Sequence, residues 1–219
     1  MQQLKSINET LEYFMKKMLI LDQQTQADIK SGKKEFHAAD FYIRKKLGGG
    51  TGIQDIIKET DSLAAAVTNI DKAKLYKGQD LLLTSIGLAY AYSASTTTVD
   101  TQDYSSNIYK INDVVADDVM TAVGVPVRYI PVGICNAEFS MSAGGNLIYK
   151  SRVRKFLSEA TAGYAAEAND ENCVLLQVPK LVQAEKLLKM QLEFGANAAA
   201  LSNNHFIEVR LQGLYLADR

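Results

Sequence analysis

Residue types that often carry chemistry are scarce in this chain of 219 residues. It contains no tryptophan, three prolines, two cysteines and two histidines. His37 and His205 each lack a second histidine nearby, so the sequence gives no local support for a zinc site, and we expect a surface or capping role for both. Cys135 and Cys173 lie in apolar stretches, where cysteines are usually buried and inert. We therefore expect two buried thiols instead of a disulfide, no metal and no other cofactor.

The chain also lacks a strong charge of either sign and a long apolar run. Its net charge is −1, without the basic excess of nucleic-acid-binding proteins, so we expect no sequence-specific nucleic acid binding. The apolar run Met18 to Leu21 is far shorter than the roughly 20 residues that span a bilayer. The opening residues do not follow the order of a secretory signal. We expect a protein that is made in a reducing cytoplasm and is not secreted.

No catalytic fingerprint stands out either. The run from Gly48 to Gly52 is followed by Ile53 and Gln54, where a phosphate-binding loop needs Lys and then Ser or Thr. The third glycine of a dinucleotide-binding pattern is missing as well, so we interpret the run as a hinge or turn. Adjacent acids such as Asp117-Asp118 are usually solvated loop residues. These observations favour a protein that is not an enzyme.

The chain begins with the pattern of a helix. Apolar residues recur at spacings of three and four from residue 2 to about residue 29, which predicts a helix with one apolar seam. The seam consists of Leu4, Ile7, Leu11, Phe14, Met18 and Leu21. Such a helix can pack on its own domain, pack on a neighbouring subunit or lie flat on a membrane, and the sequence leaves these alternatives open.

A basic stretch follows the predicted helix. Between residues 30 and 46 only Glu35 and Asp40 oppose six bases, namely Lys30, Lys33, Lys34, Arg44, Lys45 and Lys46. One interpretation is a solvated linker, and the other is an arm that touches acidic lipid head groups or nucleic acid phosphates. We assign residues 1–52 to an N-terminal helix and flexible arm.

From residue 80 onward the hydrophobic period becomes two. Between Leu82 and Tyr92 large side chains alternate with small ones, which predicts a long strand. Gly144-Gly145-Asn146 predicts the turn of a hairpin whose second strand runs from Leu147 to about Phe156, and further strands are expected at 173–178, 186–194 and 206–212. The last strand should place Ile207, Val209 and Leu211 inward. Its outward residues should be Glu208, Arg210 and Gln212.

The number and spacing of these strands indicate the fold class. About eight strands fall between residues 70 and 216, and several connections between them are long. Long connections suit a Greek-key sandwich or a jelly roll better than an up-and-down barrel. We therefore predict a mainly β fold in which residues 53–219 form a jelly-roll β-sandwich behind an N-terminal α-helix, and the number of strands favours a single jelly roll over a double one.

Several segments resemble a known family. They are Asn136 to Phe139, the Gly144-Gly145-Asn146 hairpin, Pro179 to Val182 and Phe206 to Gly213. In style and pattern they are similar to structural proteins of tailless, icosahedral, membrane-containing bacteriophages, and most of all to the jelly-roll major capsid protein of a small phage of Flavobacterium-like bacteria. The resemblance covers roughly residues 36–216 and contains no diagnostic motif.

The resemblance implies upright jelly rolls in trimeric or pseudo-hexameric capsomers, which form a shell around an internal membrane. Larger relatives carry two jelly rolls in one chain, whereas this sequence has strands for about one. The implied partners are further copies of the chain, other capsid proteins and a lipid membrane touched by the N-terminal arm, and the implied location is the virion. Two alternatives remain open: another virion component, such as a spike, penton or minor coat protein, and a glycan-binding β-sandwich module.

Overall fold

Strands dominate the part of the chain that the structure describes. The computed structural model describes residues 23–49, 51–93, 98–102, 104, 109–110, 129–156, 172–196 and 204–218. In chain order the elements are α2 (Gln23–Lys30), β1 (Lys34–Leu47), β2 (Ile53–Asp55), β3 (Asp80–Ser93), β4 (Tyr109–Lys110), β5 (Tyr129–Ile130), α3 (Val132–Asn136), β6 (Glu138–Ala143), β7 (Asn146–Arg152), the 3-10 helix η2 (Val153–Phe156), β8 (Cys173–Val182), β9 (Leu188–Glu193) and β10 (Asn204–Asp218).

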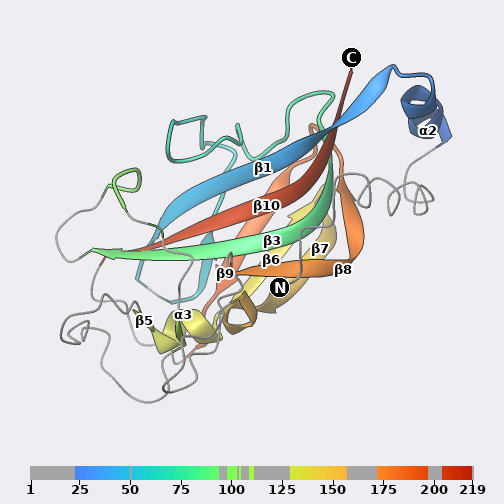
Figure 1. Cartoon of the computed structure of the whole chain (residues 1–219). Helices are drawn as coiled ribbons and strands as arrows, with labels where there is room; N and C mark the ends of the chain where they lie inside the picture. The colour runs from blue at the N-terminus through green and yellow to red at the C-terminus, as the bar shows by residue number, and fades with distance from the viewer. Residues whose placement is uncertain are drawn as a thin grey trace.

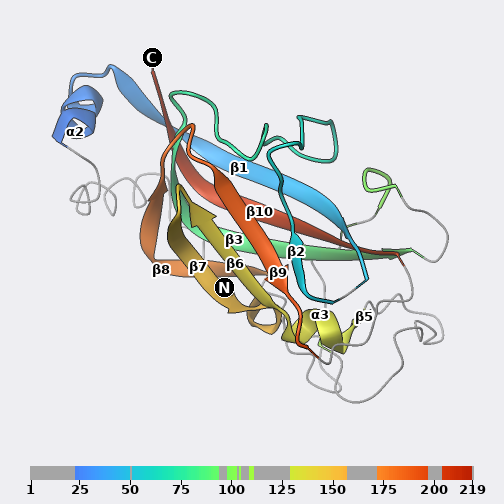
Figure 2. The ribbon, with the colours of Figure 1, turned by 180° about the vertical axis from the view of Figure 1, so that it is seen from behind.

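Eight of these strands form two antiparallel sheets that face each other (Figures 1 and 2). Sheet A has the order β1-β10-β3-β8, and sheet B has the order β2-β9-β6-β7, while β4 and β5 form a separate parallel pair. Apolar side chains from both sheets belong to one buried cluster, so the sheets pack as the two layers of a sandwich-like fold. The prediction of a mainly β fold with about eight strands is confirmed.

The strand pairing within the two sheets is nested. Without the short strands β4 and β5, the first strand in chain order pairs with the eighth (β1 with β10) and the second with the seventh (β2 with β9). The third pairs with the sixth (β3 with β8), and the fourth pairs with the fifth (β6 with β7). Because β10 also pairs with β3, the last strand of the chain lies inside sheet A.

The core is built from the inward half of each alternating strand. In β9, Leu188, Met190 and Leu192 are buried, while Lys189 and Glu193 are exposed. Successive side chains of a strand point to opposite faces, so this alternation turns the apolar row of sheet B toward sheet A. Each large apolar side chain buried in this way contributes about 1.5–3 kcal/mol.

The outer faces of the two sheets differ. On sheet A, outward residues are buried as well: Ala89 and Ala91 on β3, and Phe206 on β10, are almost inaccessible although they are not part of the core cluster. On sheet B the outward residues Lys189 and Glu193 are exposed to solvent, and so are the apolar Ile53 and Leu147 on its edge strands. The outer face of sheet A is therefore buried around β3 and β10, whereas the outer face of sheet B is exposed at Lys189 and Glu193.

Three connections meet at one end of the two sheets, which we call the turn end (residues 71–77, 144–147 and 184–187). The amide of Gly144 donates to the carbonyl of Leu187 at 2.9 Å, and the amide of Glu185 donates to the carbonyl of Leu75 at 3.1 Å. Figures 1 and 2 show α2 and the C-terminus at the same end. Residues far apart in the sequence thus share one surface.

The structure corrects the predicted flexible arm. The sequence predicts an arm up to residue 52, but residues 34–47 form β1, which pairs with β10 from Lys34 opposite Asp218 to Leu47 opposite His205. The physical reason is that Ile43 and Leu47 are buried, which fixes the segment as a strand. The predicted helix is confirmed for residues 23–29, and its earlier residues lie outside the described ranges.

Two predicted strand ends also differ. The strand from residue 173 was expected to stop before Pro179, but β8 continues to Val182. Its register against β3 jumps from Lys180 to Leu175, so Pro179 lies where no partner residue needs its missing N–H. In the hairpin, β7 ends at Arg152, and residues 153–156 form η2 in place of the predicted strand.

Candidate functional site

The two predicted sets of site residues have different outcomes. The apolar seam of the N-terminal helix (Leu4, Ile7, Leu11, Phe14, Met18 and Leu21) lies outside the described residues, and its role stays a prediction. Among the residues that the structure describes, no helix is long and apolar enough to cross a membrane. The basic residues from Lys30 to Lys46 are described, and they carry the first part of the site.

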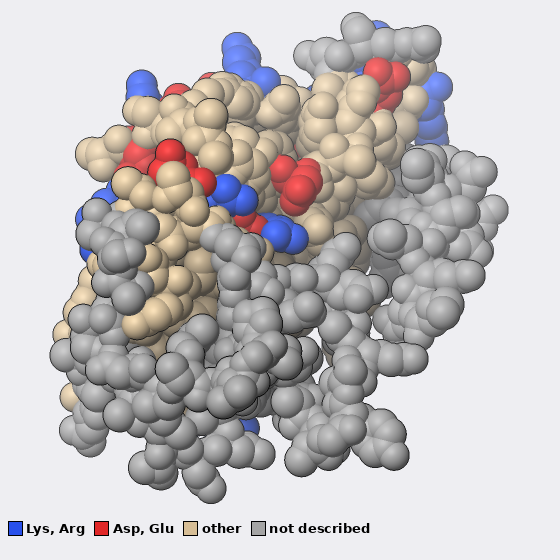
Figure 3. Space-filling model, turned by 60° about the vertical axis from the view of Figure 1, so that its left-hand side comes forward, with Lys and Arg blue, Asp and Glu red and all other residues tan. Residues whose placement is uncertain are grey.

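The basic residues are divided between two environments. Arg44 and Lys45 on β1 form ion pairs, and the Nζ of Lys45 lies 3.2 Å from a carboxylate oxygen of Asp61. The other four make no ion pair with a described residue: Lys30 in α2, Lys33 before β1, and Lys34 and Lys46 within β1. On the face that Figure 3 views, basic and acidic side chains alternate without a large area of one sign. The stretch is therefore not a uniformly basic arm.

The partner of Arg44 is a buried carboxylate in the outer face of sheet A. Glu208 on β10 is only 1% exposed and lies directly opposite Arg44 in the register. The Nε–H of Arg44 donates to Glu208 Oε2 at 2.5 Å, and the Nε–H of Arg210 donates to Oε1. Two guanidinium groups thus replace the water that a buried carboxylate loses.

Arg44 also joins two connections to the sheet. One of its terminal NH groups donates to the carbonyl of Ala66 at 2.7 Å. Its guanidinium carbon lies 4.6 Å from the ring centroid of Tyr104 and 5.3 Å from that of Tyr42, which are cation–π distances. Burial raises the pKa of the Tyr104 hydroxyl well above its usual 10, although the charge of Arg44 acts in the opposite direction. The cluster is a structural clamp centred on Arg44.

The sequence did not predict this clamp. Glu208 was expected on the solvent side of the last strand; its side chain does lie on the outer face, but that face is covered. The alternation of β10 places Glu208 beside Arg210 two residues later. Arg44, however, is 164 residues away, and only the β1–β10 register brings it into contact.

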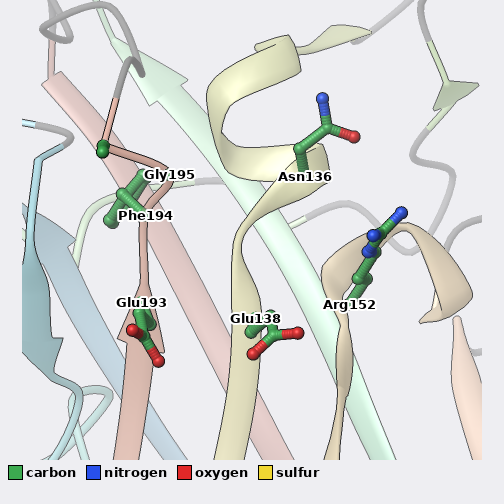
Figure 4. A pocket seen from close by; sticks show the side chains of 7 residues that line it. Asn136, Glu138, Arg152, Glu193, Phe194 and Gly195 are labelled. Atoms are coloured by element: carbon green, nitrogen blue, oxygen red, sulfur yellow. The ribbon is translucent and has the colours of Figure 1, made fainter.

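A second group of polar residues lies in a groove on the outer face of sheet B. Its volume is about 510 Å³, and its lining includes Asn136, Glu138, Arg152, Glu193 and Phe194. Figure 4 shows Glu193 and Glu138 side by side on neighbouring strands, with Arg152 on the next strand. The register places Glu138 directly opposite both.

Lys150 neutralises part of the acidic charge beside the groove. Its Nζ lies 2.8 Å from Glu138 and 4.0 Å from Glu193. The hydrogen bond and the charge of Lys150 lower the pKa of Glu138, and Glu138 in turn raises the pKa of Lys150. Glu138 is therefore a charged hydrogen-bond acceptor at neutral pH. The groove offers acceptors and a guanidinium to a polar ligand.

The two histidines differ from each other. We expected a surface or capping role for both, and for His205 this is wrong: it is fully buried, and its Nδ1 lies 2.7 Å from the hydroxyl of Tyr90. His37 is half-exposed, lies 3.1 Å from Glu35 and stacks on Tyr215 at 5.1 Å between ring centroids. The two cysteines are not joined in a disulfide, as expected; Cys135 is buried and Cys173 half-buried.

Apolar side chains are exposed on three of the strands at sheet edges. Ile53 on β2 is 61% exposed and Leu147 on β7 is 63% exposed, and Leu175 and Val178 are exposed on β8. Large apolar residues on a sheet edge are a favourable place for contacts between proteins.

Comparison with family models and with curated sequences gives no relative. No protein-family model matches this chain, and no curated protein sequence matches it. The features that bear on function are therefore the fold, the edge residues and the groove.

Proposed function

We propose that this protein is a viral coat protein whose sandwich is a jelly roll and whose copies assemble into an icosahedral shell. The resemblance to the major capsid proteins of membrane-containing phages motivates the proposal. The observation that carries it is the nested strand pairing of the two sheets. A jelly roll, the fold common in viral capsids, can be described as a long hairpin of four strand pairs that is rolled into two layers. Such a hairpin pairs the first strand with the eighth, the second with the seventh, the third with the sixth and the fourth with the fifth, so the nested pairing supports the proposal.

The exposed edge residues support self-assembly. A closed shell needs contacts on several sides of each subunit, because every copy meets several neighbours. Ile53, Leu147 and Leu175 lie on three different edge strands, so apolar contacts are offered on more than one side. Many weak contacts of this kind, repeated by symmetry, add up to a stable assembly.

Sedimentation velocity combined with electron microscopy of the purified chain tests the coat-protein proposal. We expect trimers or larger symmetric particles, and we expect Leu175→Lys to reduce them because it places a charge on the edge of sheet A. Leu63→Lys is the matched control, since Leu63 is an exposed apolar residue outside the sheets. A chain that stays monomeric at high concentration would contradict the proposal.

The groove on sheet B favours a second candidate, a glycan-binding module. Carboxylates, an amide and a guanidinium around one concave surface can hydrogen-bond to sugar hydroxyls. A glycan array tests this candidate with the wild type, Glu193→Gln and the control Lys189→Gln, which changes an outward residue of the same strand. Binding that is lost only in Glu193→Gln supports the module, and an array without any bound glycan rejects it.

A further inference from the structure

Apolar side chains project from all three segments of the turn end. They are Tyr76, Leu147 and Leu187, and each is exposed. The backbone hydrogen bonds between Gly144 and Leu187, and between Leu75 and Glu185, bring the three segments together. The turn end therefore presents one tyrosine and two leucines on a shared surface, and none of them belongs to the buried core cluster.

Lysines surround these apolar residues. Lys72, Lys74, Lys77 and Lys186 are all exposed. Two of the nearby acids are half-buried and already accept hydrogen bonds from the backbone. Asp71 accepts from the amide of Leu63, and Asp80, at the start of β3, accepts from the amide of Ala184. Glu185 is the exposed acid among residues 71–80 and 184–187. The turn end is thus both basic and apolar.

The backbone holds one of these lysines outward in an unfavourable conformation. Lys72 and Ala73 have φ angles of 47° and 56°, in the left-handed region that residues other than glycine rarely adopt. The amide of Lys74 donates to the carbonyl of Asp71 at 2.8 Å and closes the turn. Burial of Ala73 beneath the turn retains this conformation and leaves Lys72 in solvent.

We propose that the turn end binds the surface of an anionic lipid membrane. Tyrosine and leucine side chains insert at the boundary between head groups and acyl chains, and lysines around them are attracted to anionic head groups. α2 and the start of β1 lie at the same end and add the exposed Lys30 and Lys33, which outnumber the exposed Glu35. The inference does not depend on the coat-protein proposal, because binding to a vesicle requires no shell.

The charge pattern favours a membrane over a second copy of this chain. Two copies that met through this end about a twofold axis would bring like-charged lysines together. An anionic lipid surface attracts the same lysines, and its interior accepts the apolar side chains. The charges and the apolar residues therefore act together only on a membrane.

The absence of tryptophan makes the inference directly testable. In Leu147→Trp the introduced indole is the single tryptophan of the full-length chain and reports on the turn end. Ile53→Trp is the matched control: Ile53 is 61% exposed against 63% for Leu147, and it lies at the opposite end of the sandwich, beside Glu193. Both probes are measured with vesicles of phosphatidylcholine, with and without phosphatidylglycerol, and with brominated lipids as quenchers.

We expect the emission of Leu147→Trp to shift to the blue and to be quenched by brominated lipid only when phosphatidylglycerol is present, while Ile53→Trp does not respond. If Leu147→Trp binds the vesicles but its indole keeps the emission of a water-exposed tryptophan, the inference is overturned, because another segment would then hold the membrane. Failure of the protein to bind anionic vesicles would overturn it as well.

A second pair of variants tests the lysines without changing the apolar residues. Lys72→Gln with Lys74→Gln should weaken binding to anionic vesicles by about 25-fold, if each lysine contributes about the amount usual for a basic residue near an anionic surface. Arg154→Gln with Lys155→Gln removes the same charge from exposed residues beyond the other end of β7 and should change binding little. Equal weakening by both pairs would overturn the inference.

Discussion

Sheet A and sheet B use the same alternation of residues, yet sheet A also buries outward residues, on its two central strands β3 and β10. Its outer face contains the buried Glu208, which two arginines satisfy. The outer face of sheet B contains Glu138 and Glu193, which lie in solvent beside Lys150. The comparison shows that a polar residue in a strand contributes to stability according to what covers it, and not according to its place in the alternation.

The sharpest test of this difference exchanges one arginine on each sheet for methionine. Arg44→Met leaves Glu208 buried with only Arg210, and loss of one partner of a buried ion pair usually costs about 3–5 kcal/mol. Arg152→Met, on the exposed face of sheet B, should change the free energy of unfolding by less than about 0.5 kcal/mol. Urea unfolding measures both. Equal effects of the two variants would remove the distinction between the sheets.

Alanine substitution at two glycines tests how closely neighbouring strands of sheet A approach each other. A Cβ at Gly213 would collide with the backbone carbonyl oxygen of Leu82, at the point where the register of β10 against β3 shifts. We expect Gly213→Ala to cost about 1–3 kcal/mol, as overpacking does. Gly195, which follows β9 of sheet B, has open space around it, so Gly195→Ala is the control. Thermal unfolding that is unchanged in Gly213→Ala would contradict the close approach.

The same substitution should lower the free energy of unfolding at one tyrosine and not at another. The hydroxyl of Tyr90 on β3 is bonded to His205, and Tyr90→Phe should cost about 0.5–1.5 kcal/mol. The buried hydroxyl of Tyr149 on β7 has no hydrogen-bond partner within the described ranges, so Tyr149→Phe should leave the free energy of unfolding unchanged or raise it. Chemical denaturation of both variants checks the signs. A destabilised Tyr149→Phe would show that its hydroxyl does have a partner.

The smallest expected effect is the pH dependence of the pair Glu138–Lys150. Because Lys150 lowers the pKa of Glu138, the contribution of Glu138 is present above its ordinary pKa of 4.5 and is lost as the pH falls through the lowered pKa. Glu138 raises the pKa of Lys150, so the contribution of Lys150 is present below 10.5 and is lost as the pH rises through the raised pKa. Melting temperatures of wild type and Glu138→Gln should differ slightly at neutral pH and converge in acid. A difference that persists below the lowered pKa would contradict this origin.

The sequence predicts best the features that depend on neighbours along the chain. The alternation in β9 and the hairpin turn at Gly144-Gly145 follow from local periodicity and turn chemistry, and the structure confirms them. In β3 the predicted alternation is confirmed from Ile86 to Tyr90, but before Ser85 a register shift places Leu81 and Leu83 in the core in place of Leu82. The first strand was missed because its charges resemble a solvated linker. Its apolar residues Phe41, Ile43 and Leu47 alternate, but Lys45 takes the position between Ile43 and Leu47 and interrupts the pattern that would have revealed a strand.

The sites depend on distant pairs and were therefore less predictable. Glu208 looks like an ordinary outward residue until Arg44 is placed opposite it. The groove on sheet B requires β6 and β9 to be neighbours, and the order of strands in a sheet cannot be obtained from periodicity. Exposed apolar residues such as Leu147 also depend on the register, because β6 and β7 shift past each other between Met141 and Ser142.

The position of β10 between β1 and β3 has a consequence for biosynthesis. During translation β1 and β3 leave the ribosome long before residues 204–218, so both wait with open hydrogen-bonding edges for a strand that does not yet exist. Sheet A can close only after synthesis of that segment, and nascent chains on crowded polysomes expose the same edges to one another. A folding catalyst or chaperone that shields β1 and β3 during this interval should raise the yield of native protein.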